Sequence, residues 1–280
     1  MKSALLRKLV SRGLHERVRG GYRLARFLSR NLNSVPISIG GKTLFVDLRG
    51  LDGHALSLFC SSPLSDAPHE RSLKDVFARF IKPDDVVFDV GANLGVHTLT
   101  FSSLAGQVIA FEPNPGLLPN LRMTVTNLPN AQVVDVCLSK EDGEATFHVS
   151  QWDHMLGSLA NWTGQPTTAV TVATRSIDSL IATGDVPRPD MMKVDVEGAE
   201  LFVFAGAEKL LSSENAPRVI IFEELNKASE RLGISKGAAS EYLRDKGYSL
   251  FLITDDGTVP LPVERPFAAN LLALRERPTF

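Results

Sequence analysis

The stretch Asp89–Gly95, which reads Asp-Val-Gly-Ala-Asn-Leu-Gly, decides the fold of this chain. It follows the apolar run Val86–Phe88, so the sequence predicts a buried strand that ends in a tight turn before a helix. Gly91 and Gly95 allow a turn in which the backbone approaches a ligand closely. Asn93 adds a side chain that both donates and accepts hydrogen bonds. The stretch therefore predicts a ligand-binding junction.

Glu112 is the next informative residue along the chain. It follows the apolar run Val108–Phe111 and lies 23 residues after Asp89, where a carboxylate can accept hydrogen bonds from two ribose hydroxyls. The glycine pattern is G-x-N-x-G, whereas a dinucleotide pyrophosphate calls for G-x-G-x-x-G. A nucleoside ligand without phosphates is favoured, with S-adenosylmethionine as the first candidate. An NAD-dependent oxidoreductase is the alternative, because the same acid suits the ribose of NAD.

Short apolar runs alternate with helical stretches through the body of the chain. Runs that are apolar on both faces are typical of a parallel sheet covered by helices on both sides. The tail adds two strand-like segments, Tyr248–Ile253 and Phe267–Leu274, around the turn residues Asp255–Gly257, and one of them is expected to be antiparallel. The sequence thus predicts an α/β, Rossmann-like fold, with central strands at 86–88, 108–111, 133–134, 191–194 and 219–222.

Acidic side chains follow four of these runs, at the ends of the predicted strands: Asp89, Glu112, Asp195 with Glu197, and Glu223 with Glu224. Ligands of open α/β sheets bind outside the carboxyl ends of the strands. A single Asp at such a position often caps the next helix, but four strand ends together predict an acidic crevice. An acidic mouth suits a cationic sulfonium and disfavours a polyanion such as nucleic acid.

Three motifs lie in order along the body: Asp89–Gly95 with Thr98, then Phe-Glu-Pro-Asn-Pro at Phe111–Pro115, then Lys-Val-Asp-Val-Glu-Gly-Ala-Glu at Lys193–Glu200. In this combination, from about Pro83 to Leu274, the chain resembles the FkbM-type methyltransferases. The resemblance implies a class I methyltransferase domain. It also implies S-adenosylmethionine-dependent O-methylation of a hydroxyl on a sugar, a glycolipid or a secondary metabolite.

The resemblance further implies which residues bind the cofactor: Asp89, Gly91, Ala92, Asn93, Gly95, Thr98, Glu112, Pro113, Asn114, Asp135, Cys137 and Leu138. Asp89, Gly91, Asn93 and Gly95 would surround the methionine part, and Glu112 would hold the ribose hydroxyls. Cys137 and Leu138 would flank the adenine, and Asp135 would reach its polar edge. Plain strand packing is the alternative for these last three residues.

Lys193, Asp195 and Glu197 are spaced by two, so in a strand all three side chains face the same way. This pattern predicts that Asp195 and Glu197 lie beside the transferred methyl group and the acceptor hydroxyl. A structural ion pair between Lys193 and Asp195 is the alternative. Methyl transfer to an alcohol is an in-line displacement, so it needs alignment of the reacting atoms.

The alcohol also loses its proton as it attacks, and Asp195 is the first candidate for the general base. His154 is the second candidate, in the segment Gln151–Thr163, which is long enough to form a lid over the site. A Mg²⁺ ion held by Asp195, Glu197 and Glu223 is the alternative to a base, since hard oxygen ligands suit this ion.

Charge is distributed unevenly along this chain of net charge −2. Residues 1–30 carry nine basic side chains and one acid, a local charge of +8, so the other 250 residues carry −10. An apolar residue recurs every fourth position from Leu6 to Tyr22 and predicts helix, broken near Gly13 and Gly20 into two pieces. Residues 36–59 are expected to form antiparallel strands, with a hairpin turn at Gly40–Gly41. The predicted division is an extension over 1–66 and a methyltransferase domain over 67–280.

The basic segment has four interpretations: docking on an anionic membrane surface, contact with nucleic acid, an organelle transit peptide, or a helical extension packed on the body. No apolar run approaches the ~20 residues of a membrane span, and two cysteines exclude a disulfide framework. We expect a cytoplasmic protein, with membrane association through residues 1–30 as an alternative. RNA methylation is a rival function that only the basic segment supports, and a non-catalytic binder would have lost the glycines or Glu112.

Overall fold

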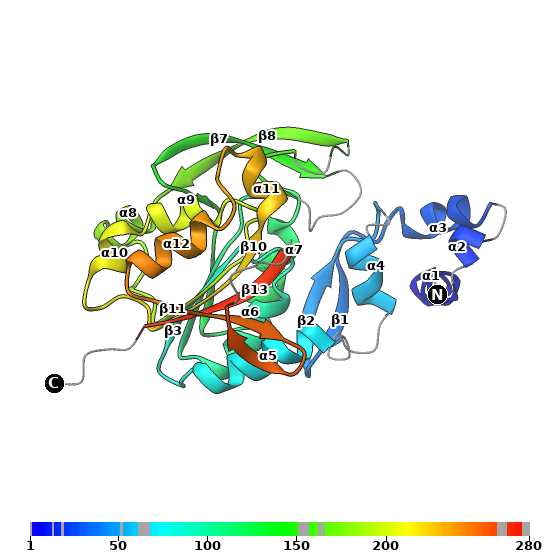
Figure 1. Ribbon diagram of the computed structural model, residues 1–280. Helices are drawn as coiled ribbons and strands as arrows, with labels where there is room; N and C mark the ends of the chain where they lie inside the picture. Colours follow the sequence, from blue (N-terminus) through cyan, green and yellow to red (C-terminus); the bar gives the residue numbers. More distant parts are fainter. Residues whose placement is uncertain are drawn as a thin grey trace.

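The structure is a computed structural model that describes residues 2–12, 14–17, 20–50, 53–60, 68–150, 157–161, 164, 166–261 and 268–275. Eight strands in this part of the chain form a central sheet in the order β12-β11-β13-β10-β9-β3-β4-β5 (Figure 1). Their bounds are β3 Val86–Val90, β4 Gln107–Phe111, β5 Ala131–Val134, β9 Met191–Val194, β10 Val219–Leu225, β11 Ser249–Thr254, β12 Gly257–Pro260 and β13 Ala268–Leu274.

The pairing of these strands confirms the predicted α/β fold class. Strands β5, β4, β3, β9 and β10 run parallel to one another, and β13 runs antiparallel to both β10 and β11. The chain order reverses between β3 and β9, because β4 and β5 lie on one side of β3 and β9 on the other. Ligands bind at such a reversal. Strand β12, which begins at Gly257 in the expected turn, was not predicted.

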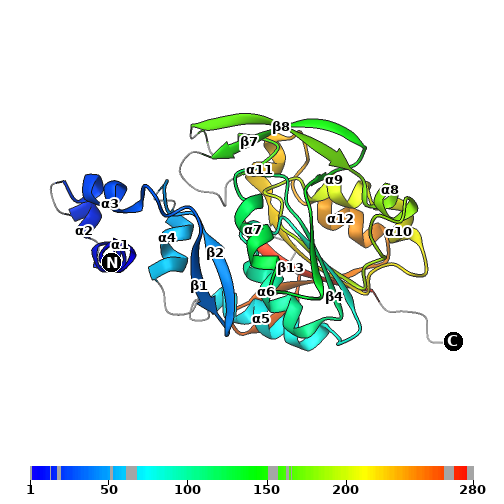
Figure 2. The same cartoon turned by 180° about the vertical axis from the view of Figure 1, so that it is seen from behind.

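Helices cover both faces of this sheet (Figures 1 and 2). One face carries α5 Pro68–Phe80, α6 Val96–Leu104 and α7 Leu118–Val125, and the other carries α8 Ile177–Ala182, α9 Glu200–Ala205, α10 Glu208–Ser212 and α12 Ala238–Asp245. Strand β3 shows why its sequence is apolar throughout: Val87 packs with Phe77 and Phe101 on the first face, whereas Phe88 packs in the core of the second. Helix α11, Asn226–Arg231, follows the carboxyl end of β10.

A second sheet lies across the carboxyl ends of the central strands, at the top of Figure 1. It contains β6 Cys137–Leu138, β7 Gly143–Ser150 and β8 Thr167–Arg175; β7 pairs antiparallel and β6 parallel with β8. The sequence did not predict β7 and β8. The expected lid, Gln151–Thr163, connects them, and the described residues within it are 157–161, where Ser158 pairs with His148.

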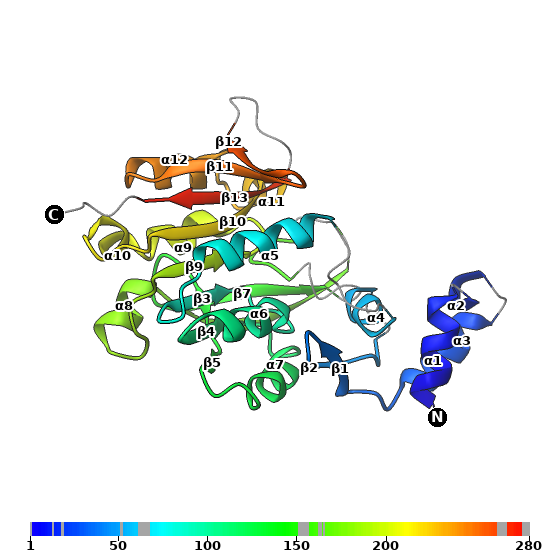
Figure 3. The same cartoon turned by 90° about the horizontal axis from the view of Figure 1, so that it is seen from below.

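The N-terminal residues form three helices, α1 Lys2–Ser11, α2 Leu14–Arg17 and α3 Gly21–Ser29, one more than the sequence predicted. They are followed by the hairpin of β1 Val35–Ile39 and β2 Lys42–Val46, which turns at Gly40–Gly41 with positive φ at both glycines. The prediction of strands up to residue 59 is wrong, because α4 Gly53–Cys60 is a helix that packs its apolar residues in the same core. Figure 3 shows α1–α3 projecting beyond the hairpin, away from the central sheet. None of the described helices is long and apolar enough to cross a membrane.

The hairpin is joined to the body by hydrogen bonds and by apolar packing, and Figure 2 shows it beside α7. The Phe45 N–H donates to Thr124 Oγ1 at 3.0 Å, and Lys42 Nζ donates to Ser102 Oγ at 2.6 Å. Leu44 of the hairpin and Leu121 of α7 are both fully buried in the same core. The hairpin therefore supports α6, which begins at the junction after β3, and α7, which packs behind that junction.

Candidate functional site

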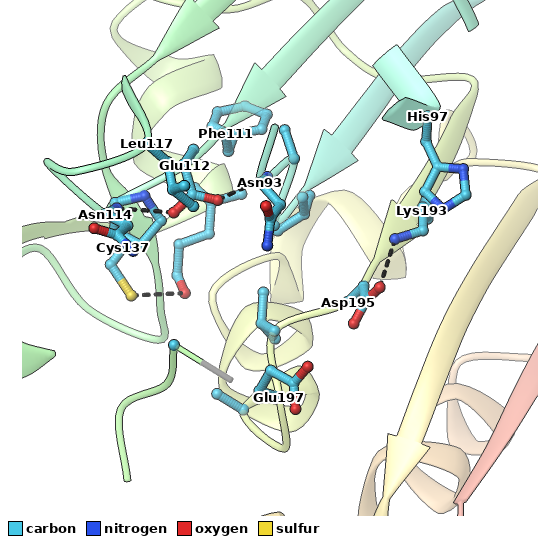
Figure 4. Close-up of a pocket in the computed structure, with 18 of the residues that line it drawn as sticks. Asn93, His97, Phe111, Glu112, Asn114, Leu117, Cys137, Lys193, Asp195 and Glu197 are labelled. Carbon is cyan, nitrogen blue, oxygen red and sulfur yellow. Dashed lines mark hydrogen bonds and ion pairs between the residues drawn. The ribbon is translucent and has the colours of Figure 1, made fainter. Parts of the chain in front are cut away.

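A cavity of about 260 Å³ opens at the carboxyl ends of the central strands, where the strand order reverses. Figure 4 shows Glu112 and Lys193 on opposite sides of it. Most of the residues that the sequence nominated line this cavity: Gly91, Ala92, Asn93, Glu112, Pro113, Asn114, Cys137, Leu138, Lys193, Asp195, Glu197 and Glu223. The topology thus brings residues from five strand ends to one hollow.

The loop after β3 is held in place by the ends of the two neighbouring strands, β4 and β9. The N–H groups of Gly91 and Ala92 both donate to the Phe111 carbonyl at 3.0 Å. Gly91 has φ +80, and a Cβ there would lie 1.9 Å from the Asp195 carbonyl oxygen. Glycine is thus required by contact with the chain itself, in addition to any approach to a ligand. Asn93 has φ 54, a strained conformation for a non-glycine residue that is typical of functional loops.

Glu112 lies in the cavity wall with 5% of its surface exposed. Its Oε2 accepts the Asn93 N–H and its Oε1 accepts the Asn114 N–H, both at 2.8 Å. Burial raises the pKa of Glu112 to about 7, although the two N–H donors lower it. Each carboxylate oxygen has a second lone pair. The residue can therefore accept two hydroxyl donors without losing its backbone contacts, which fits a ribose.

Three of the nominated cofactor residues lie behind the loop, outside the cavity lining: Asp89, Gly95 and Thr98. Thr98 Oγ1 donates to Asp89 Oδ2 at 2.5 Å, and the Asp89 side chain is buried. Burial raises the pKa of Asp89, against the nearby Lys193, which lowers it. A Cβ on Gly95 would lie 2.8 Å from Leu121 Cδ1. These residues shape the loop from behind.

The adenine-side residues separate into two groups. Cys137 and Leu138 line the cavity, and burial together with Glu112 raises the pKa of the Cys137 thiol to about 12, so that it stays protonated. Asp135 does not line the cavity: it pairs with Arg122 at 2.8 Å on the surface, where more than half of each side chain is exposed. The attraction of Arg122 accounts for that orientation.

Strand β9 ends at Val194, sooner than the alternation of Lys193, Asp195 and Glu197 requires. Glu197 has φ 53, so the chain turns after the strand, and all three side chains nevertheless line the cavity. Lys193 Nζ donates to Asp195 Oδ2 at 2.7 Å, with 5% of the lysine side chain exposed. Burial alone would lower the pKa of Lys193, but attraction to Asp195 and Asp89 outweighs it and raises the pKa.

Three carboxyl groups, those of Asp195, Glu197 and Glu223, lie close enough to influence one another. Burial first, and then the charge of Asp195, raises the pKa of both Glu197 and Glu223, and Glu223 also forms a hydrogen bond with Asp195. The alternative of a Mg²⁺ ion is not supported, because in the described part of the chain no group of three His, Cys, Asp or Glu side chains is arranged to hold a metal ion. Lys193 already occupies one carboxylate oxygen of Asp195.

Sequence reasoning missed several residues of the site. Glu200 is buried, and its Oε1 accepts the N–H groups of Val196 and Gly198, which fixes the turn that carries Glu197. Leu73, Phe147 and Asn270 line the cavity from α5, β7 and β13, and no local signal marks them. His97 was not missed: its place directly after the glycine loop indicates a histidine that can reach the pocket, and it does line the cavity, with its ring packed against Phe77 and Phe101. His154 lies outside the described residues.

Comparison with known proteins matches residues 89–250 to the family described as the methyltransferase FkbM domain. The chain is 38% identical over 135 residues to the hexuronic acid methyltransferase AglP of Haloferax volcanii, a match that covers 47% of this chain and 54% of that protein. It is 28% identical over 152 residues to the 2-O-methyltransferase NoeI of Sinorhizobium fredii, covering 47% of this chain and 60% of that protein.

Among solved structures, the precorrin-6y C5,15-methyltransferase of Geobacter metallireducens GS-15 is similar with a TM-score of 0.39 and 17% identity, over 73% of this chain and 88% of that chain. The matches to AglP and NoeI span 54% and 60% of the length of those two proteins. The family match covers more than half of the chain and contains the loop after β3, Glu112 and the Lys193–Glu200 motif. The chain therefore belongs to the FkbM methyltransferase family.

Proposed function

We propose that the protein transfers a methyl group from S-adenosylmethionine to a hydroxyl of a sugar. The observation that carries the cofactor assignment is Glu112, a buried carboxylate in the cavity wall that keeps two acceptor positions after binding the Asn93 and Asn114 N–H groups. A carboxylate with two free acceptor positions can bind the two neighbouring hydroxyls of a ribose. Family membership supports the same cofactor.

The other cofactor contacts follow from the lining of the cavity. Gly91, Ala92 and Asn93 would surround the methionine part, and Cys137 with Leu138 would flank the adenine from the second sheet. The protonated thiol of Cys137 is apolar enough to pack on a base. When bound, S-adenosylmethionine supplies a methyl group on a positively charged sulfur. The oxygen atoms of the carboxyl groups at the opposite side of the cavity can lie toward that charge.

Asp195 is the proposed general base. Its Oδ2 is held by Lys193, and about a third of its side chain remains exposed in the cavity, so Oδ1 can take the proton of an acceptor hydroxyl. Burial and the charge of Asp195 raise the pKa of Glu223 to about 7, so below that pH this neighbour carries a proton that it can donate to Asp195. His154 remains the second candidate, on sequence grounds alone.

A sugar is the proposed acceptor class. The relatives AglP and NoeI are named as a hexuronic acid methyltransferase and a 2-O-methyltransferase. At the side of Lys193 the lining adds Glu197, Glu223 and Asn270. Glu223 and Asn270 face each other across β10 and β13. Carboxyl and amide groups of this kind are suited to hydrogen bonds with several hydroxyls.

The test has two stages. Calorimetry with S-adenosylhomocysteine should show binding by the native protein and a loss of about tenfold or more in Glu112→Ala, because charge-assisted hydrogen bonds are removed. Glu144→Ala, at an exposed position of β7, is the matched control and should bind as the native protein does. Unchanged binding in Glu112→Ala, or binding of NADH in place of S-adenosylhomocysteine, would overturn the cofactor assignment.

The second stage identifies the acceptor. The native protein is incubated with S-adenosylmethionine carrying a labelled methyl group and with separate panels of uronic acids, neutral sugars, amino sugars and RNA. Labelled sugars are then treated with alkali, which cleaves methyl esters and leaves methyl ethers intact. Loss of the label shows that the methyl group was placed on a carboxyl, and retention shows that it was placed on a hydroxyl. Label stable to alkali in a sugar supports the proposal, whereas label confined to RNA, or removed as an ester, overturns the sugar hydroxyl as acceptor.

A further inference from the structure

Helices α1 and α3 expose apolar side chains beside the residues that they bury. Leu6 and Ala25 are fully buried, and Leu28 is 5% exposed, in the core that also holds the hairpin. On the outer side, Leu5, Leu24 and Phe27 are 49%, 45% and 50% exposed. A helix that is apolar on two sides is normally covered on both. The outer side therefore lacks the cover that its sequence calls for within the described residues.

The three exposed residues lie on one side of the packed pair of helices. Lys2 and Leu5 are one turn apart on α1, and Leu24 and Phe27 are one turn apart on α3. The Lys2 ammonium lies 5.6 Å from the centre of the Phe27 ring, so the two exposed stripes adjoin. Figures 1 and 3 show these helices on the far side of the hairpin from the central sheet.

Basic side chains surround this apolar stripe. Lys2, Arg23, Arg26 and Arg30 are all exposed on the same two helices, and the Arg30 guanidinium lies 4.4 Å from the centre of the Phe27 ring. Arg7 is different, because its guanidinium lies 4.7 Å from the centre of the Phe59 ring and so connects α1 with α4. Long basic side chains around Leu and Phe can reach lipid phosphates while their stems lie against acyl chains.

We propose that this surface, Leu5, Leu24 and Phe27 with Lys2, Arg23, Arg26 and Arg30, docks the protein on an anionic phospholipid bilayer. The +8 charge of residues 1–30 complements the anionic headgroups. The apolar stripe favours lipid over nucleic acid, because binding to a phosphate backbone gains nothing from two exposed leucines. None of these residues lines the cavity, so the docking surface is separate from the site.

Vesicle flotation of the full chain tests the proposal directly. We expect binding to vesicles of phosphatidylcholine mixed with phosphatidylglycerol, none to phosphatidylcholine alone, and release as salt screens the charges. Arg23→Gln with Arg26→Gln should lower the partition coefficient by about 25-fold, since each basic side chain near an anionic surface contributes roughly fivefold. Leu24→Ser with Phe27→Ser should abolish binding in salt that the native protein tolerates.

The matched controls lie on the body of the protein. Lys227→Gln with Arg231→Gln removes two exposed charges from α11, and Val259→Ser removes a side chain that is 44% exposed on β12. Both should bind vesicles as the native protein does. Circular dichroism and S-adenosylhomocysteine binding should be unchanged in every variant, which separates loss of docking from loss of fold or of the proposed function.

Three results would overturn the inference: no flotation of the native chain with anionic vesicles, equal losses in the α3 and α11 charge variants, or a Leu24→Ser, Phe27→Ser double variant that floats as before. Retention on RNA without any flotation would assign the basic helices to nucleic acid instead. None of these results depends on whether the cavity binds S-adenosylmethionine.

Discussion

Lys193 and Asp195 form an ion pair at 2.7 Å that closes one side of the cavity, with the lysine almost entirely buried. Lys193 also lies opposite Asp89 in the register of β3 and β9, and the Asp89 side chain is buried as well. One ammonium thus offsets two carboxyl groups at the reversal of the sheet. That arrangement supports both the position of the proposed base and the stability of the two strands.

Replacing Lys193 by Met should cost about 3 kcal/mol or more of unfolding free energy, because it leaves the buried Asp89 and its neighbour Asp195 without their cation. Urea denaturation measures this loss. Arg122→Met is the control, since its partner Asp135 is more than half exposed and such a pair is worth at most about 1 kcal/mol. Equal losses in the two variants would show that the Lys193 ion pair behaves as a surface pair.

Gly91→Ala should disrupt the loop after β3. The new Cβ would lie 1.9 Å from the Asp195 carbonyl oxygen, and φ +80 is itself strained for alanine, so we expect a loss of at least ~3 kcal/mol in urea denaturation, together with weaker S-adenosylhomocysteine binding. Gly184→Ala shares the positive φ but meets nothing within 4 Å. It should cost only about 1 kcal/mol, the strain of the backbone. If both variants lose the same amount, the contact with Asp195 is unimportant.

The affinity for S-adenosylhomocysteine should depend on pH through Glu112. Burial raises the pKa of this carboxyl to about 7, so it is increasingly protonated as the pH falls through that value, and a protonated carboxyl is the weaker hydrogen-bond acceptor. Affinity should therefore rise with pH across that region in calorimetry. Glu112→Gln should bind about tenfold more weakly above it and should lose the pH dependence. A variant that retains the native pH profile would assign the titration to another group.

Folding stability should fall as the pH rises between 4.5 and about 8, in part because of Glu200. Burial raises its pKa in the folded state to about 8, so the folded protein holds a proton that the unfolded chain has already released. Each such group contributes a slope of at most ~1.4 kcal/mol per pH unit. Glu200→Gln should flatten the curve measured by urea denaturation at a series of pH values. Glu230→Gln, at an exposed position, should leave it unchanged; curves for Glu200→Gln that run parallel to the native one would argue against this assignment.

Asp195→Asn should lower kcat by about 10²- to 10⁴-fold with the sugar that the acceptor panel returns, while S-adenosylhomocysteine binding stays near the native value. Single-turnover kinetics separate the two quantities. Glu223→Gln keeps a hydrogen-bond donor toward Asp195 and should have a smaller effect. Should Asp195→Asn keep native kcat, the base must lie elsewhere, and His154 becomes the first candidate.

The sequence predicted the parts of the structure that depend on local pattern. The strand before Asp89, the hairpin at Gly40–Gly41 and the antiparallel strand β13 follow from apolar runs and turn residues. The three motifs led to a single cavity because parallel strands end at the same edge of the sheet.

The features that the sequence did not indicate depend on tertiary contacts. Strands β7 and β8 carry few large apolar side chains, so their period is weak. Asp135 is drawn to Arg122, which is separated from it by 13 residues. Asn270 and Leu73 reach the cavity from opposite ends of the chain. No residue close to these positions in the sequence indicates their structure or their role.

The contacts of the hairpin set a lower limit on how far the chain can be shortened. The family match begins at residue 89, yet Leu121, which backs Gly95, shares its core with Leu44 of β2. A chain trimmed to the matched region would leave that leucine facing water and would free α7 from Thr124 onward, where Phe45 now holds it. The smallest unit that can be expected to keep its cofactor loop in shape therefore starts upstream of residue 35, and a shorter fragment would be prone to aggregate.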